Sequence, residues 1–129
     1  MGAAGIEDGV MGVIRFDNGL LAQFHDAFTT KFATTGFEIH GSEGSLVATN
    51  VMTQRPVGEV LLRTSKGEKR LELEPENLYV RSVRKFHKAI AGKGAPSATG
   101  EDGVRSMAVG VAALKAAKSG REAKVEPGL

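Results

Sequence analysis

The chain has 129 residues, no cysteine and a formal net charge of +2. This length suits one domain with a real core, and the shares of 41% apolar and 25% charged residues are typical of a globular chain rather than a disordered one. The absence of cysteine excludes disulfides, thiolate zinc sites and thiol catalysis, and the small net charge gives no argument for a nucleic-acid partner.

Two alternating segments near the start of the chain predict a β-hairpin. Apolar residues recur with a period of two over residues 10–16 and again over residues 20–28, which is the pattern of a strand. The sequence DNG lies between them, and Asn-Gly tolerates the positive φ angles of a tight hairpin turn. We therefore expect the first two strands to be neighbours in an antiparallel sheet.

A glycine pair follows a second strand-like run in the sequence FEIHGSEGSL. Residues 37–40 and 45–48 have the pattern of short strands, and Gly41 and Gly44 lie between them. Glycine-rich turns after strands can also bind phosphate, but a dinucleotide site needs a third glycine and a helix that begins at the turn. The pair therefore predicts a hairpin turn rather than a nucleotide site.

A third hairpin is expected before the pattern changes. Its strands are predicted over residues 60–64 and 70–74, with Gly67 in the turn between them. After Pro75 the apolar period becomes helical, with one face formed by Tyr79, Val83, Phe86 and Ile90.

A second helix and a last strand are expected near the C-terminus. Thr99 is a suitable N-cap residue, with Asp102 three positions later, and Gly120 is a suitable residue just after the end of the helix. Residues 121–125 are long enough for one short final strand.

This order of elements defines the fold class. Strands in hairpins followed by helices predict an α+β domain over residues 1–129, with a mostly antiparallel, open-faced β-sheet and two C-terminal helices packed on one face. No alternating βαβ pattern is present.

The polar residues supply no complete catalytic set. His25, His40 and His87 lie on separate expected elements without metal-ligand spacing, so we expect no metal site. His25 and Asp26 are adjacent on a strand and therefore face opposite sides. The basic helix has no aromatic stacking platform, and no run approaches the roughly eighteen apolar residues of a membrane span, so neither a nucleic-acid nor a membrane partner is expected.

Several segments, taken in order, resemble the C-terminal domain of the Gfo/Idh/MocA oxidoreductases, the relatives of glucose–fructose oxidoreductase and inositol dehydrogenase. They are EDGVMGVIRFDNGLLAQFHDAF, FEIHGSEGSL and NLYVRSVRKFHKAIAGKGAPSATGEDGVRSMAVGVAALKAAKSGREAKV. The resemblance covers about residues 6–125. FHDAFTTKF and VMTQRPVG resemble more particularly one sugar-reductase branch of that family.

The resemblance implies a parent enzyme of two domains that oxidises or reduces a sugar or polyol with NADP or NAD. In such enzymes a Rossmann domain holds the cofactor, and the C-terminal sheet closes the substrate site and commonly mediates dimers. The family's glycine-rich cofactor loop, its Glu-Lys-Pro motif and its Asp-x-x-x-His motif are absent from these 129 residues. We therefore expect a C-terminal fragment that binds no cofactor, holds no catalytic residue and is inactive without a Rossmann domain as its partner.

Five polar residues are candidates to contact a sugar in the intact parent, because sugar recognition needs hydrogen-bonding groups at the edge of a cleft. They lie in the segments that resemble the reductase branch and are His25, Asp26, Thr29, Thr30 and Arg55.

An alternative function is a non-enzymatic interaction or dimerisation module. Its exposed sheet face would associate with another copy, since large apolar patches drive association. That face would carry either Val10, Ile14 and Phe16 or Met11 and Val13. The first residues have neither a basic region nor an apolar run, so no secretory signal is expected and a cytoplasmic location is the default.

Overall fold

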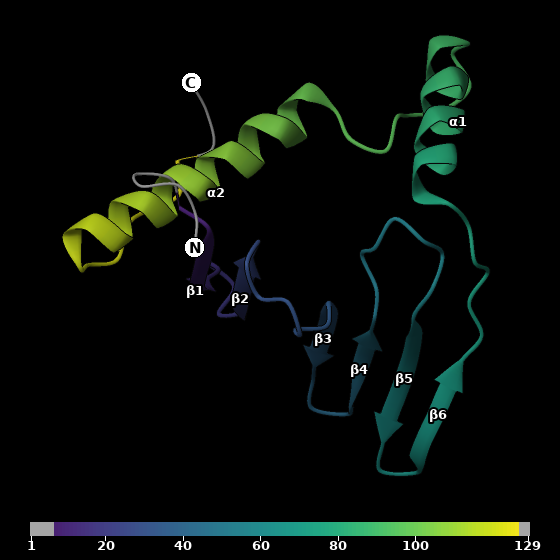
Figure 1. The fold of residues 1–129 in the computed structure, drawn as a ribbon, viewed down its shortest axis with the longest axis horizontal. Helices are drawn as coiled ribbons and strands as arrows, with labels where there is room; N and C mark the ends of the chain where they lie inside the picture. The colour runs from purple at the N-terminus through teal and green to yellow at the C-terminus, as the bar shows by residue number, and fades with distance from the viewer. Residues whose placement is uncertain (1–6, 127–129) are drawn as a thin grey trace. The chain divides into compact units, whose positions relative to one another are not determined.

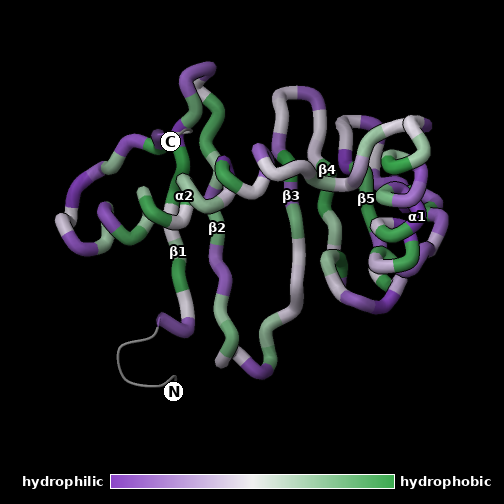
Figure 2. Tube along the Cα trace, turned by 90° about the horizontal axis from the view of Figure 1, so that it is seen from above, coloured by the Kyte–Doolittle hydropathy of each residue, from purple (hydrophilic) through white to green (hydrophobic). Residues whose placement is uncertain are grey.

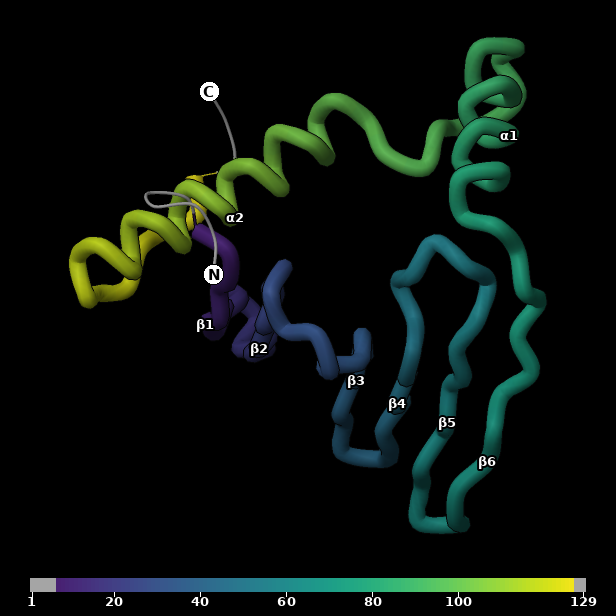
Figure 3. Tube along the Cα trace, in the orientation of Figure 1, coloured from purple at the N-terminus to yellow at the C-terminus, as the bar shows by residue number. Residues whose placement is uncertain are grey.

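A computed structural model describes residues 7–126 of the chain; the first six residues, where no secretory signal is expected, lie outside them. Within this range the strands precede the helices, which confirms the α+β class (Figure 1). The elements in chain order are β1 (Gly9–Arg15), β2 (Leu21–Ala27), β3 (Gly36–His40), β4 (Gly44–Thr49), β5 (Glu59–Thr64), β6 (Gly67–Leu71), α1 (Leu78–Ile90) and α2 (Gly100–Ser119). Figure 3 follows the chain through this order by colour.

The strands form two antiparallel sheets rather than one. β1 and β2 form a two-stranded sheet, and β3, β4, β5 and β6 form a four-stranded sheet in sequential order. The chain divides accordingly into two compact units. One holds the β1–β2 hairpin and nearly all of α2, and the other spans residues 34–100 and holds the larger sheet with α1.

The β1–β2 hairpin turns at the predicted DNG sequence. The Gly19 amide donates to the Phe16 carbonyl at 2.9 Å, and the Phe16 amide donates to the Leu20 carbonyl at 2.9 Å. Gly19 has a φ of 87°. A turn followed by a glycine in the left-handed region is a common way to close a short hairpin, and it accounts for the glycine at this position.

One face of the four-stranded sheet is apolar. In the strand register, Ile39 lies opposite Leu46, Leu46 opposite Leu62, and Val60 opposite both Ala48 and Leu71. The other face is polar at both outer strands. β4 lies inside the sheet and supplies two of the three buried apolar residues found in the described chain, Val47 and Ala48; the third is Ala112 of α2. The core is therefore small and centred on β4.

Both helices begin and end where local chemistry dictates. The Asn77 side chain accepts hydrogen bonds from the amides of Tyr79 and Val80 at 3.0 and 3.2 Å, so it caps the first turn of α1. Gly92, with a φ of 69°, follows the end of α1. For α2, the helix begins directly after Thr99 and ends directly before Gly120, whose φ is 64°, as predicted.

Two predictions about strands were wrong. β6 begins at Gly67 rather than at residue 70, because Gly67 pairs with Thr64 and the turn holds only Ser65 and Lys66. Residues 121–126 form no strand, since no ladder partner lies beside them in the described structure. Ala123 and Val125 are nevertheless half-buried while their neighbours are exposed, which is the burial pattern of an extended segment.

Large apolar side chains remain exposed in both units. Along α1 the predicted apolar stripe lies at the surface, and each of its residues is more than half exposed: Tyr79, Val83, Phe86 and Ile90. On the β1–β2 hairpin, Met11 is 74% exposed and Val13 is 67% exposed. Apolar side chains that gather on an exposed face often mark a surface that packs against another domain or chain.

Candidate functional site

Four of the five candidate sugar contacts follow one another along β2 and the bend after it. His25 lies opposite Met11 and Asp26 opposite Val10, so the two side chains face opposite sides of the hairpin, as expected. Thr29 and Thr30 follow the end of the strand, and the Ala33 amide donates to the Thr30 carbonyl at 3.3 Å. All four side chains belong to exposed residues, so their hydrogen-bonding groups are accessible to solvent.

Arg55, the fifth candidate, lies in the loop between β4 and β5 and belongs to the other unit. Its carbonyl accepts from the Thr53 hydroxyl at 2.9 Å and from the Val57 amide at 2.8 Å, which fixes the backbone around it. Two non-glycine residues of the loop, Asn50 and Met52, have positive φ angles of 55° and 59°. Such conformations are uncommon outside glycine, so this loop is held in a specific shape. The sugar-binding role of these five residues stays a prediction.

The polar face of the larger sheet carries a row of hydrogen-bonded side chains, and no sequence motif indicates this row. His40 contacts the Ser45 hydroxyl through Nδ1 at 2.9 Å and the Glu38 carboxylate through Nε2 at 3.0 Å. The register explains the first contact, because His40 and Ser45 lie opposite each other on β3 and β4. Glu38 and His40 lie two residues apart on the same face of β3, and the register of the predicted hairpin places Ser45 beside them.

The same face continues across β5 and β6. Arg63 Nε donates to Glu68 Oε2 at 2.6 Å, and this bond raises the pKa of the Arg63 guanidinium above its ordinary value. The guanidinium therefore stays charged at every pH at which the protein would be handled. Both side chains are about half exposed, so the pair contributes little to stability.

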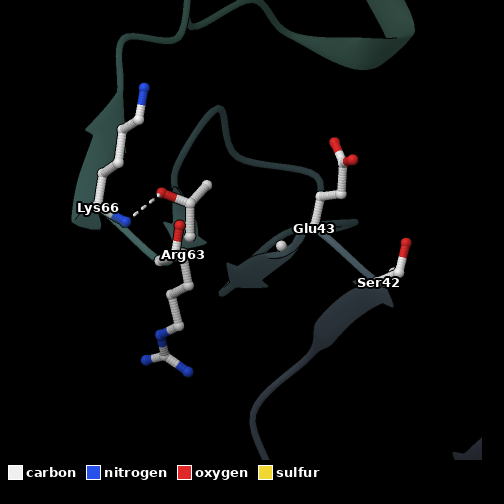
Figure 4. A pocket seen from close by; sticks show the side chains of 8 residues that line it. Ser42, Glu43, Arg63 and Lys66 are labelled. Atoms are coloured by element: carbon white, nitrogen blue, oxygen red, sulfur yellow. Dashed lines mark hydrogen bonds between the residues drawn. The ribbon is translucent and has the colours of Figure 1, made fainter.

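An open hollow of about 790 Å³ lies at the turn end of this sheet. It is lined by Gly41, Ser42 and Glu43 of the β3–β4 turn, by Arg63 near the end of β5 and by Lys66 of the β5–β6 turn, among others. Figure 4 shows that Arg63 points away from Lys66 and that Glu43 lies apart from both. They do not converge on one position, as the groups of a ligand site do.

The glycine pair at this hollow forms a hairpin turn, as predicted. The Gly41 amide donates to the Gly44 carbonyl at 2.9 Å, and β4 begins at Gly44. Because a strand rather than a helix follows the turn, no helix N-terminus is available to bind a phosphate there. In the described range 7–126, no group of three His, Asp or Glu side chains could hold a metal ion. Within that same range, no helix has the length and apolar character needed to cross a bilayer.

Comparison with known proteins assigns the family. Residues 1–126 match the profile of the C-terminal alpha/beta domain of an oxidoreductase family, named for Gfo, Idh and MocA. The match covers nearly the whole chain, so the chain belongs to this family. The α+β architecture, with antiparallel hairpins before two helices, agrees with it.

One known enzyme is similar to the chain over its whole length. The chain is 62% identical to the 1,5-anhydro-D-fructose reductase of Ensifer adhaerens over 129 residues. The alignment covers the whole of this chain but 39% of the reductase. This reductase represents the sugar-reductase branch that the sequence resembles. The chain spans about two fifths of the length of this relative.

Proposed function

We propose that this chain is the substrate-side and oligomerisation domain of an NAD(P)-dependent reductase that acts on 1,5-anhydro-D-fructose or a closely related sugar. The observation that carries the proposal is the identity of 62% with a reductase of that substrate across the whole chain. The match to the C-terminal domain of an oxidoreductase family supports the same assignment.

We further propose that the chain alone binds no nicotinamide cofactor and is inactive. Hydride transfer requires a nicotinamide held against the substrate and a proton donor within reach. The described residues hold no glycine-rich turn between a strand and a helix, and the turn with Gly41 and Gly44 leads into β4. NADP or NAD would therefore be held by a Rossmann domain, with which this chain would form the substrate site.

Calorimetric titration of the purified chain with NADPH and NADH tests this part of the proposal. We expect no heat of binding for either nucleotide at concentrations that saturate the Ensifer adhaerens reductase, which serves as the positive control. Saturable binding to the chain alone would place a nucleotide site in it and would overturn the assignment of the cofactor to another domain.

A second candidate function is the interaction module. The observation that favours it is the exposed face of the β1–β2 hairpin, which carries Met11, Val13 and Leu21 at 74%, 67% and 65% exposure. The opposite face, with Ile14 and Phe24, is half-buried. We expect sedimentation velocity to detect association that increases with protein concentration; a clean monomer at high concentration would count against this function.

A further inference from the structure

The turn between β1 and β2 holds the one Asn-Gly sequence of the chain, Asn18 followed by Gly19. It forms a hydrophilic tip of the hairpin, coloured purple between β1 and β2 in Figure 2. Both residues are exposed, and in the described part of the chain a Cβ atom at Gly19 would meet no atom within 4 Å beyond its chain neighbours. Little therefore hinders water, or rotation about the bonds that join the two residues.

The Asn18 side chain is folded back along the chain that follows it. Its Oδ1 accepts a hydrogen bond from the Leu20 amide at 3.1 Å, which is the contact of an Asx turn. This contact polarises the side-chain carbonyl, and it places a donor where negative charge forms on Oδ1 when a nucleophile adds to Cγ. Among residues 7–126 the Asn18 Nδ2 atom has no hydrogen-bond partner, so nothing in that range holds it as a leaving group.

One contact of the turn opposes an attack by the next backbone nitrogen. The Gly19 amide donates to the Phe16 carbonyl at 2.9 Å, and this bond holds the proton that the nitrogen must lose. The bond lies at the turn end of a two-stranded hairpin, where the backbone opens at a much lower free energy than that of global unfolding. Opening of the turn alone therefore releases the nitrogen while the rest of the domain stays folded.

We infer that Asn18 is a site of self-modification, at which the Gly19 nitrogen attacks the Asn18 side chain and converts it, through a succinimide, into aspartate and isoaspartate. The inference rests on the turn alone and does not depend on the proposed reductase function.

The reaction needs only water and hydroxide as co-reactants. Hydroxide takes the proton of the Gly19 amide, and the nitrogen bonds to Asn18 Cγ while an electron pair of the carbonyl moves to Oδ1. When that pair returns, the bond from Cγ to Nδ2 breaks, and Nδ2 takes a proton from water and leaves as ammonia. Water then adds to one of the two ring carbonyl carbons and breaks its bond to the Gly19 nitrogen. Opening at Cγ gives aspartate, and opening at the backbone carbonyl gives isoaspartate.

The modification changes both the charge and the backbone of the turn. Either product adds a negative charge beside Asp17. The succinimide has no Gly19 N–H and therefore loses the bond to Phe16, and isoaspartate adds one atom to the backbone of the turn. Because the length of the turn sets the register of a hairpin, we expect the isoaspartate form to exchange the Phe16 amide hydrogen faster.

Peptide mapping by mass spectrometry tests the inference with controls inside the same molecule. The chain has two further asparagines, Asn50 before Val51 and Asn77 before Leu78, and both are exposed. In each, the side chain of the following residue crowds the attacking nitrogen, and the β-branched valine does so most. During incubation of the folded chain at mildly alkaline pH, we expect Asn18 to form isoaspartate about tenfold faster or more than either control.

Gly19→Ala tests the part played by the glycine. We expect it to slow the conversion of Asn18 about tenfold or more, because its methyl group hinders the attack. Gly67→Ala is the matched control and should leave the rate unchanged. Gly67 also has a positive φ, 116° against 87° for Gly19, and a Cβ there likewise meets no described atom within 4 Å, so both variants carry similar backbone strain. A turn that Gly19→Ala merely opened would react faster rather than slower.

Three outcomes would overturn the inference. Conversion at Asn18 no faster than at Asn50 or Asn77 would show that the turn has no special reactivity. Equal rates in Gly19→Ala and the unchanged chain would show that the glycine does not make the site reactive. Conversion of Asn18 in urea, with none in the folded chain, would show that the bond to Phe16 locks the nitrogen and that folding protects the site.

Discussion

At the scale of single residues, Gly41 and Gly44 serve the hairpin in different ways. Neither has a positive φ, so the turn does not demand glycine for its backbone conformation. A Cβ atom at Gly44 would lie 2.6 Å from the Arg63 carbonyl oxygen, whereas a Cβ at Gly41 would lie at an ordinary 3.6 Å from the Gly44 oxygen. The sequence predicted the turn correctly, but the need for Gly44 comes from its neighbour β5, which a sequence pattern does not reveal.

Gly44→Ala should therefore destabilise the four-stranded sheet by about 1–3 kcal/mol, because β4 and β5 must move apart at this point. Gly41→Ala is the matched control and should change the free energy of unfolding by less than about 1 kcal/mol in either direction. Urea unfolding followed by circular dichroism measures both. Equal losses for the two variants would contradict the close-packing explanation.

Sugar contacts can be tested in a hybrid reductase, in which this chain replaces the matched segment of the Ensifer adhaerens enzyme. Arg55→Met should raise the KM for 1,5-anhydro-D-fructose about tenfold with little change in kcat, which is the signature of a lost binding contact. Arg63→Met is the control, since Arg63 bonds to Glu68 on the sheet face. An unchanged KM for the Arg55 variant would remove this residue from the site.

His25→Ala in the same hybrid tests a second candidate sugar contact. The variant should also raise KM about tenfold if the imidazole donates to a sugar hydroxyl. His40→Ala is its control, because His40 is occupied by Glu38 and Ser45. A loss of activity in the His40 variant, with none in the His25 variant, would move the site from β2 to the face of the larger sheet.

At the scale of elements, turn and cap residues were better guides than strand lengths. The DNG turn, the helical stripe of α1 and the glycine after α2 were all predicted, because each depends on chemistry within a few residues. β6 was misplaced because Gly67 was assigned to the turn, whereas the register makes it the first residue of the strand. The cap at Asn77 was missed, although an asparagine before an apolar helical run is a signal for an N-cap.

Asn77→Ala tests the cap. The substitution leaves the amides of Tyr79 and Val80 without their acceptor, and it should destabilise the start of α1 by about 1 kcal/mol. Hydrogen exchange at these two amides should accelerate about fivefold, while Asn77→Asp, which keeps an acceptor oxygen, should preserve the protection. Unchanged exchange in the alanine variant would show that the cap contributes nothing.

At the scale of the whole molecule, the sequence predicted the fold class but not the division of the strands between two sheets. Hydrophobic period and turn chemistry are local, so they identify hairpins without showing which hairpins join. The candidate site has the same limit: the reductase-like segments that carry His25 and Arg55 lie in two separate units. The polar face has this limit where two hairpins join, since the pairing of β4 with β5 places Ser45 opposite Arg63.

The kcat/KM of the unmodified hybrid reductase for 1,5-anhydro-D-fructose with NADPH tests the central claim most directly. We predict a value within about tenfold of the Ensifer adhaerens enzyme, because tenfold corresponds to a loss of only about 1.4 kcal/mol of transition-state stabilisation. The isolated chain should give no activity in the same assay. A hybrid that folds and binds NADPH but does not reduce the sugar would contradict the account.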